Sequence, residues 1–324
     1  MDALRLARAV LVAACAGAAA FAGAQDYPRE PVRLIVPYPP GGSTDVIARL
    51  YAEGLGKELG QPIVVDNRPG ASTNIGSEAV ARAKPDGYTV LFGGGGPTLN
   101  SVFGPKPSFD PMTGLDAVSM IARVPFMVAA NPRVPFGNVR EMVSTVRAAP
   151  GKYSISSAQL NVYVELMKER AGTDILHVPY KGGAQAATDA VAGQVDMVYA
   201  LVPVLLPQVQ SGKLKAIGVS SARRLTAVLP DVSTFAEAGV DYDIGTWYAL
   251  QVPPGTPAPV VERLARATRA IVAQPAFVER LTAIGAEAVA STPAEMRRQM
   301  QQQQAVWTRL AKAVPSLVIA EPTR

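Results

Sequence analysis

Short apolar runs rich in β-branched residues recur along the chain, and longer stretches with helical spacing separate them. Runs of this kind, bounded by Gly, Pro and Asn, are typical of strands buried in a sheet. The expected strands are Val32–Val36, Ile63–Val65, Tyr88–Phe92, Val118–Ile121, Phe126–Ala129, Tyr153–Ser156, Ile175–Val178, Met197–Ala200, Ala216–Val219 and Tyr248–Val252. Strands that alternate with helices predict an α/β architecture with largely parallel sheets.

Helix start signals support this alternation. Asn138 is placed as an N-cap before an apolar stripe that ends at Val146. A second stripe follows the Thr256-Pro257 pair and continues to about Ile271. Thr292 and Glu295 have the spacing of a capping box, which predicts a helix through about Lys312. These stripes are interpreted as core-facing helix surfaces.

The first 24 residues have the pattern of a secretory signal peptide. Arg5 and Arg8 precede an apolar run, and the small residues Ala22–Ala24 form a cleavage site. We expect cleavage after Ala24 and a location in the bacterial periplasm. The alternative is a lipoprotein signal with acylation at Cys15, although the apolar run before that cysteine is short.

Composition narrows the function further. The chain has 324 residues, 48% of them hydrophobic, which is enough for two domains or one large one. The net charge of +5 is spread over single basic residues, unlike a nucleic-acid or membrane-binding patch. With one His and one Cys, a zinc site with several such ligands and an intramolecular disulfide are excluded. These counts remove many enzyme mechanisms, and we expect no enzyme activity, no cofactor and no metal.

The turn after the first strand is the first candidate for ligand binding. It carries Gly41 and Gly42 and opens a helix that continues to about Lys57. Free N–H groups at a helix N-terminus, together with the helix dipole, favour a carboxylate or phosphate. Ser43 or Thr44 is a possible cap for that helix, so an ordinary capped helix start remains the alternative.

Two later turns repeat this logic. The segment Phe92–Thr98 contains four consecutive glycines, which allow a ligand to approach the backbone, but it does not match a nucleotide-binding fingerprint. A flexible loop is the alternative there. Tyr180–Gly183 again joins a strand to a helix, which starts at about Ala184. Turns at the carboxyl ends of parallel strands are where ligands of such folds bind.

Several side chains near these turns have alternative roles. Asp45 complements the helix dipole or holds a ligand ammonium group. Lys181 adds positive charge to an anion site or is simply solvated. Trp247 walls a pocket or fills a hinge. His177 lies within an apolar strand and is expected to be a packed, hydrogen-bonded residue rather than a catalytic base.

The order of motifs closely resembles the Bug family, the periplasmic receptors of tripartite tricarboxylate transport. The segments that carry the resemblance are Ile35–Gly42, Asp66–Ala71, Asn74–Gly76, Pro85–Tyr88, His177–Gly182, Gly193–Asp196, Gly212–Leu214 and Glu237–Gly239. The resemblance implies a two-domain Venus-flytrap fold, with residues 25–125 and 250–324 in domain 1 and 126–249 in domain 2. It also implies a monomer that captures a small carboxylate through backbone N–H groups and bridging waters.

One segment departs from the family pattern. After Tyr153 the turn at Ser156–Asn161 is about two residues shorter than usual and lacks the family's glycine and histidine. Leu160, Val162 and Tyr163 then replace small polar groups near the site. Because an unpaired buried charge is costly, we expect monocarboxylates or less polar acids to be preferred over tricarboxylates.

The interpretation favoured by the sequence is therefore a receptor that delivers a small carboxylate to the membrane components of a transporter. The alternatives are an extracytoplasmic sensor acting with a membrane kinase and a periplasmic hydrolase, although the chain has no G-x-S-x-G motif. The ligand-binding candidates are Tyr38, Gly41, Gly42, Ser43, Thr44, Asp45, Gly93, Gly94, Ser156, Ser157, Tyr180, Lys181, Gly182 and Trp247.

Overall fold

The computed structural model describes residues 27–104, 106–158, 161–180 and 182–318. The expected signal peptide with its cleavage site after Ala24, the alternative site at Cys15, Leu160 and the candidate Lys181 lie outside these residues. Within the described ranges, every helix is too short or too polar to cross a membrane.

The strands follow the expected order. They are β1 (Val32–Val36), β2 (Ile63–Asn67), β3 (Thr89–Gly94), β4 (Asp116–Ala130), β5 (Ser154–Ala158), β6 (Leu176–Tyr180), β7 (Met197–Leu201), β8 (Lys215–Val219), β9 (Gly245–Val252) and β10 (Glu287–Ala288). The short strand β10 was not expected from the sequence.

The helices occupy the intervals between the strands. They are α2 (Ser43–Leu59), α3 (Asn74–Ala81), α4 (Gly96–Phe103), α5 (Val139–Ala148), α6 (Asn161–Ala171), α7 (Gly183–Ala192), α8 (Val202–Gln210), α9 (Ala258–Val272), α10 (Pro275–Thr282) and α11 (Pro293–Ala313). Two expected caps are confirmed. Asn138 accepts the N–H of Glu141 at the start of α5, and Thr292 forms a capping box with Glu295 at the start of α11.

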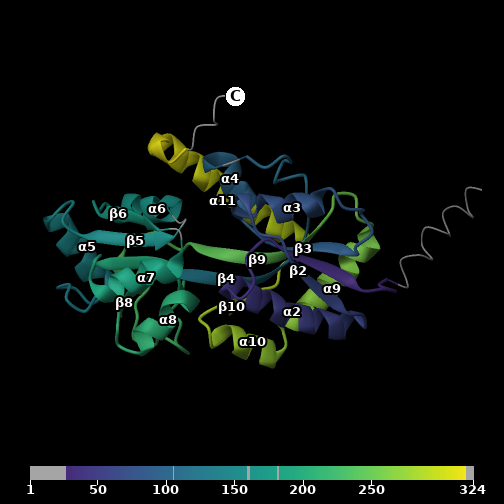
Figure 1. The fold of residues 1–324 in the computed structure, drawn as a ribbon, viewed down its shortest axis with the longest axis horizontal. Helices are drawn as coiled ribbons and strands as arrows, with labels where there is room; N and C mark the ends of the chain where they lie inside the picture. Colours follow the sequence, from purple (N-terminus) through teal and green to yellow (C-terminus); the bar gives the residue numbers. More distant parts are fainter. Residues whose placement is uncertain (1–26, 105, 159–160, 181, 319–324) are drawn as a thin grey trace, which may run out of the picture.

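The strands form two sheet regions that share β4. The first has the order β2-β1-β3-β9-β4 with β10 beside β4, and the second has the order β8-β4-β7-β5-β6. The pairs β1–β2, β1–β3, β5–β6 and β5–β7 are parallel, as expected. The strands β4 and β9 pair antiparallel with their neighbours, so each region is parallel on one side only, in β2-β1-β3 and in β7-β5-β6. Figure 1 shows the first region on the right and the second on the left.

The continuity of β4 differs from the expectation of two separate strands. Its residues Asp116–Pro125 pair with β9, and its residues Phe126–Ala130 pair with β7. Pro125 pairs with Gly245 of β9, so the chain stays extended between the two expected strands. The chain therefore passes from one sheet region to the other at Val124–Phe126 without leaving the β conformation.

The second passage precedes β9. All of β9 pairs within the first sheet region, between Gly245 opposite Pro125 and Val252 opposite Asp116. The chain therefore returns to the first sheet region at Ile244–Gly245. The expected domain boundary between residues 249 and 250 falls inside β9.

Helices cover both faces of each sheet region. In the first region, α2 and α9 pack on one face around Tyr51 and Leu264, and the N-terminal half of α11 packs on the other through Met296 and Met300. In the second region, α5 and α6 share a core on one face, and α7 and α8 cover the other.

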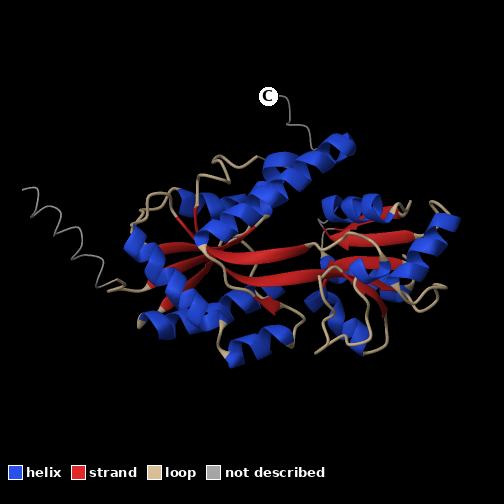
Figure 2. Cartoon of the chain, turned by 180° about the vertical axis from the view of Figure 1, so that it is seen from behind, coloured by secondary structure: helices blue, strands red, loops and turns tan. Residues whose placement is uncertain are grey.

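The helix α11 connects the two regions a third time. Beyond Met300 it continues to Trp307 and Leu310, which are buried in the same cluster as Tyr163 of α6 and Phe126 of β4. The ring centroids of Trp307 and Tyr163 are 5.0 Å apart, in an edge-on arrangement. Figure 2 shows α11 running diagonally from above the first sheet region toward the second. Relative motion of the two regions would therefore have to accommodate this helix as well as β4 and the segment before β9.

Candidate functional site

The strand directions bring the expected turns to one boundary. Gly94 at the end of β3 lies opposite Tyr248, close to where β9 begins, so β1 and β3 both end toward the second sheet region. Leu201 at the end of β7 lies opposite Phe126, so β5, β6 and β7 end toward the first region. The turns after β1 and β3 consequently face the carboxyl ends of β5 and β6.

The turn after β1 forms an open helix N-terminus. Gly41 has φ +81°, in the left-handed region that glycine adopts without penalty. Gly42 is the extended N-cap residue of α2 and provides no side-chain cap. The first intrahelical hydrogen bond is donated by Val46 to the Gly42 carbonyl, at 3.1 Å. The N–H groups of Ser43, Thr44 and Asp45 therefore precede the helical hydrogen-bond ladder and suit an anion.

The Asp45 carboxylate is directed into the turn. It is 3% exposed and accepts hydrogen bonds from the Gly41 N–H at 3.0 Å, Arg49 Nε at 2.8 Å and Asn67 Nδ2 at 2.9 Å. Burial acts to raise the pKa of Asp45, but the hydrogen bonds from Arg49, Gly41 and Asn67 hold it below its ordinary value. These partners satisfy both carboxylate oxygens, so Asp45 holds the turn in shape and leaves the charge preference of the site to the helix N-terminus.

An aromatic group lies beside this turn. The Thr44 hydroxyl is 2.6 Å from the Tyr248 hydroxyl, and both residues are buried. Tyr248 stacks on Phe92, with 5.2 Å between ring centroids, and meets Tyr38 edge-on at 6.1 Å. Burial raises the pKa of Tyr248 to about 12, although its hydrogen bond with Thr44 opposes this shift. Thr44 is thus a packing partner of Tyr248 and contributes to the site through its backbone.

The glycines after Phe92 are required by close packing. A Cβ on Gly93 would lie 2.5 Å from Gln251 Oε1, and one on Gly94 would lie 2.7 Å from the Trp247 carbonyl oxygen. One on Gly96 would lie 2.3 Å from Thr73 Oγ1. The alternative of a flexible loop is wrong, because β3 extends through Gly94 and α4 starts at Gly96.

Trp247 lies on the opposite face of the sheet from Tyr248. Side chains alternate along β9, and the indole packs with Met296 and Met300 of α11. Its Nε1 donates a hydrogen bond to Gln303 Oε1 at 3.0 Å. Trp247 is therefore packed between β9 and α11.

The turn after β6 resembles the turn after β1. Gly182 is an extended N-cap residue without a side-chain cap, and the first helical bond of α7 runs from Ala186 to the Gly182 carbonyl at 3.2 Å. A Cβ on Gly182 would meet nothing within 4 Å, so the space above this turn is open. The Tyr180 hydroxyl donates to Asp189 at 2.6 Å, along α7.

The two serines of β5 have partners inside the protein. Ser156 and Ser157 are both fully buried; the Ser156 hydroxyl donates to the carbonyl oxygens of Ala186 and Met197, at 3.1 and 3.2 Å. The Ser157 hydroxyl lies 2.8 Å from His177 Nε2. Burial lowers the pKa of His177; Glu165 opposes this shift and Lys168 adds to it. His177 is thus a packed, hydrogen-bonded residue, as expected, and the burial of Ser157 speaks against a serine nucleophile.

Tyr163 packs where α6 meets β4 and α11. It is 8% exposed and lies in the first turn of α6, with its ring centroid 4.8 Å from that of Phe126. The short turn before α6 drew attention to this position, but the packing of Tyr163 against Phe126 and Trp307, which lie far away along the chain, could not be inferred from spacing.

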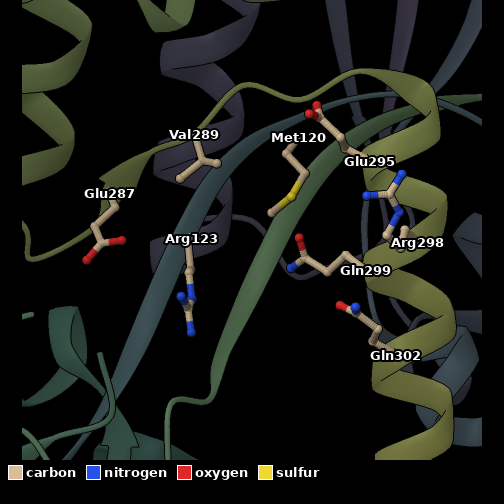
Figure 3. A pocket seen from close by; sticks show the side chains of 8 residues that line it. All are labelled: Met120, Arg123, Glu287, Val289, Glu295, Arg298, Gln299 and Gln302. Carbon is tan, nitrogen blue, oxygen red and sulfur yellow. The ribbon is translucent and has the colours of Figure 1, made fainter. Parts of the chain in front are cut away.

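A surface hollow of about 380 Å³ lies elsewhere, beside β4 and α11 (Figure 3). Its lining residues are Met120, Arg123, Glu287, Val289, Glu295, Arg298, Gln299 and Gln302, which include none of the described candidates. Arg123 pairs with Asp243, and Glu295 accepts the Thr292 N–H at 2.8 Å. With two arginines balanced by two glutamates, the hollow has no excess charge to select an anion.

The fold and the facing helix N-termini define a periplasmic-type solute-binding protein. Residues 47–315 match the family described as the tripartite tricarboxylate transporter family receptor. The chain belongs to this family of solute-binding receptors, which confirms both the family resemblance and the predicted fold class.

Similar proteins support this assignment along most of the chain. Protein BugT of Bordetella pertussis is 35% identical over 291 residues, covering 88% of this chain and 89% of BugT. The structure of Rpa4515 from R. palustris with adipate has 32% identity and a TM-score of 0.78, covering 88% of this chain and 97% of that one. The structure of MatC from Rhodopseudomonas palustris with bound malate has 29% identity and a TM-score of 0.74, with coverage of 88% and 99%.

Proposed function

We propose that this protein captures a small carboxylate-containing solute between its two sheet regions and delivers it to the membrane components of a tripartite tricarboxylate transporter. The observation that carries the proposal is the open N-terminus of α2, whose neighbouring carboxylate, Asp45, is fully engaged inside the turn. Neutral N–H donors at a positive helix end bind a carboxylate without specifying the rest of the ligand. The adipate and malate named for two similar structures are ligands of this chemical type.

The second contact surface in this proposal is the turn that precedes α7. Gly182 and the first residues of α7 provide a second set of N–H groups opposite the first. Ligand binding would then draw the two regions together about Val124–Phe126 and Ile244–Gly245, where β4 and the segment before β9 pass between them. Small-angle scattering with and without a proven ligand tests this closure, and identical profiles would count against it.

A thermal-shift screen tests the binding proposal directly. The panel contains monocarboxylates, dicarboxylates, tricarboxylates, amino acids and aromatic acids. A ligand present at about 100 times its dissociation constant stabilises the folded state by about 2.7 kcal/mol, which gives a measurable rise in melting temperature. If the folded protein responds to no carboxylate in the panel, the proposal is wrong.

Periplasmic export is the remaining part of the proposal. The pattern of residues 1–24 supports removal of a signal peptide after Ala24. Mass spectrometry of the exported protein should therefore find Gln25 at the N-terminus. A different first residue would contradict this cleavage site, and an acylated Cys15 would establish the lipoprotein alternative.

A further inference from the structure

One serine holds both passages of the chain between the two sheet regions. Ser220, directly after β8, is fully buried. Its hydroxyl accepts a hydrogen bond from the Phe126 N–H at 2.8 Å and donates one to the Ile244 carbonyl oxygen. Its own N–H donates to the Phe126 carbonyl at 2.9 Å, and its carbonyl accepts the Ile244 N–H at 3.0 Å. These hydrogen bonds fix Phe126 and Ile244 to the second sheet region.

The adjacent pair of residues is the weaker link between the regions. Pro125 lies opposite Gly245 where β4 and β9 pair. Proline has no N–H to donate, so this pair lacks a donor that other pairs in the sheet have. A Cβ on Gly245 would lie 3.0 Å from the Val124 carbonyl oxygen, so the two strands approach closely there. The pivot between the two regions is therefore expected at Pro125–Gly245.

An ion pair crosses this pivot. Arg123 lies in the part of β4 that pairs with β9. Asp243 lies next to Ile244, in the segment that Ser220 fixes to the second region. Nη2 of Arg123 contacts the Asp243 carboxylate, and the two side chains are 25% and 41% exposed. Because the partners belong to different regions, a rotation about the pivot changes the distance between them.

The structure holds the two regions apart at the proposed ligand site. Gly41 and Gly42 are exposed to solvent. An added Cβ on Gly41 or on Gly182 would meet no described atom within 4 Å. The ion pair therefore belongs to an open arrangement, in which a ligand can reach the turns before α2 and α7.

Arg123 has a second carboxylate beside it. Glu287 of β10 lies opposite Arg123 in the antiparallel pairing with β4. Directly opposed residues of two antiparallel strands project from the same face of the sheet and lie within reach of each other. Both side chains line the hollow beside α11 that Figure 3 shows. A guanidinium released from Asp243 would therefore remain next to a carboxylate.

We propose that the Arg123–Asp243 ion pair is a latch that keeps the two regions apart in the absence of ligand, and that closure on the ligand releases it. Its effect on affinity rests on the proposed function, because it concerns how readily the carboxylate site closes. A contact that exists in only one arrangement shifts the balance between the two arrangements. An ion pair of this exposure shifts that balance by up to about fivefold. Loss of the latch therefore raises the closed fraction.

The test measures the distance between the first turns of α2 and α7 in the unliganded protein. Val46→Cys and Gln185→Cys, at exposed positions of these turns, carry spin labels, and the chain's only native cysteine, Cys15, is replaced by serine. Double electron–electron resonance then gives the open and closed fractions. Asp243→Asn and Arg123→Gln should each raise the closed fraction by about 1.5- to fivefold. The double variant should show no larger rise than either single variant, because both act on one contact.

Asp241→Asn is the matched control. Asp241 pairs with Arg170 of α6 at 2.7 Å, inside the second region, and Arg170 is 26% exposed. This variant removes a similar ion pair from the same segment without touching the pivot, and should leave the closed fraction unchanged. Salt screens exposed ion pairs, so high salt should raise the closed fraction of the wild-type protein more than that of the latch variants.

Calorimetry with a carboxylate proven to bind measures the consequence for function. Both latch variants should bind this ligand up to about fivefold more tightly, because a larger share of the free protein is already closed. Asp241→Asn should bind it as the wild-type protein does.

The outcomes separate the latch from the proposed function. A closed fraction that neither latch variant changes overturns the latch while carboxylate capture stands. A rise in the double variant equal to the product of the two single rises also overturns it, because the two residues would then act independently. If the closed fractions shift as expected but no carboxylate binds, the proposed function fails and the latch stands as a property of the unliganded protein.

Discussion

Replacing Gly42 by Val is the sharpest test of the α2 N-terminus. Gly42 has φ −77° and ψ 168°, a conformation that β-branched residues adopt readily. The nearest atom to an added Cβ is the Pro39 carbonyl oxygen, at 3.9 Å. The valine side chain would therefore fit the backbone but occupy the exposed space directly before the N–H groups of Ser43 and Thr44.

The expected loss of affinity follows from those two N–H groups. A hydrogen bond to a charged acceptor contributes about 1.5–3 kcal/mol, so two such bonds account for about 3–6 kcal/mol. Blocking both should weaken ligand binding by at least about 100-fold. Stability should change by less than about 1 kcal/mol, because restricting the unfolded chain stabilises by about 0.4–1 kcal/mol while valine is a poorer N-cap residue than glycine.

Calorimetry with a proven ligand and urea unfolding measure the two effects separately. Gly137→Val is the matched control, since a Cβ there meets only Glu141 Oε2 at 3.7 Å and the position precedes α5, away from the site. The control should bind normally. A folded Gly42→Val protein with wild-type affinity would refute the assignment of the ligand carboxylate to this turn.

Three further predictions concern residues outside the ligand contacts. His177→Gln should leave ligand affinity nearly unchanged. Because burial lowers the pKa of His177 in the folded protein, the unfolded chain takes up a proton more readily, and the stability of the wild-type protein should fall as the pH drops below about 6.5. Urea unfolding of the variant should lack this pH dependence. Ser72→Gly should raise stability by about 1–2 kcal/mol, because Ser72 has φ +51°, a left-handed conformation that is unfavourable for residues other than glycine. Ala79→Gly within α3 should lower stability by about 1 kcal/mol, and equal urea midpoints for the two variants would contradict the idea that Ser72 is strained. Trp307→Ala should cost about 3–5 kcal/mol, since the side chain is fully buried where α11 meets α6, and a loss below about 1 kcal/mol in urea unfolding would show that this contact is dispensable.

The sequence predicted the repeating elements well because their signals are local. Apolar runs placed the strands to within a few residues, and Asn138 and Thr292 fixed two helix starts through side-chain caps. The sequence did not predict that β4 is one continuous strand, because a proline such as Pro125 rarely lies inside a central strand. The continuity of β4 depends on its pairing with β9, which lies more than 100 residues later in the chain, so the local pattern does not indicate it.

For the candidate site, the sequence predicted where the backbone turns lie but not how the side chains near them are directed. Glycine turns after strands marked the two helix N-termini correctly, since strand order alone brings such turns together. The directions of Asp45, Ser156 and Ser157 depend on distant partners, and all three prove to be bonded inside the protein.

The sharing of the first sheet region between the two ends of the chain has a consequence for the order of folding. The segment between the two passages, from Phe126 to Ile244, is continuous and contains the partners for its own sheet, so it can fold soon after it is synthesised. The N-terminal strands instead need β9, which sits between β3 and β4, and the helices that follow it. We expect β1–β3 to stay exposed until the last quarter of the chain is available, which makes them the segments most dependent on chaperones.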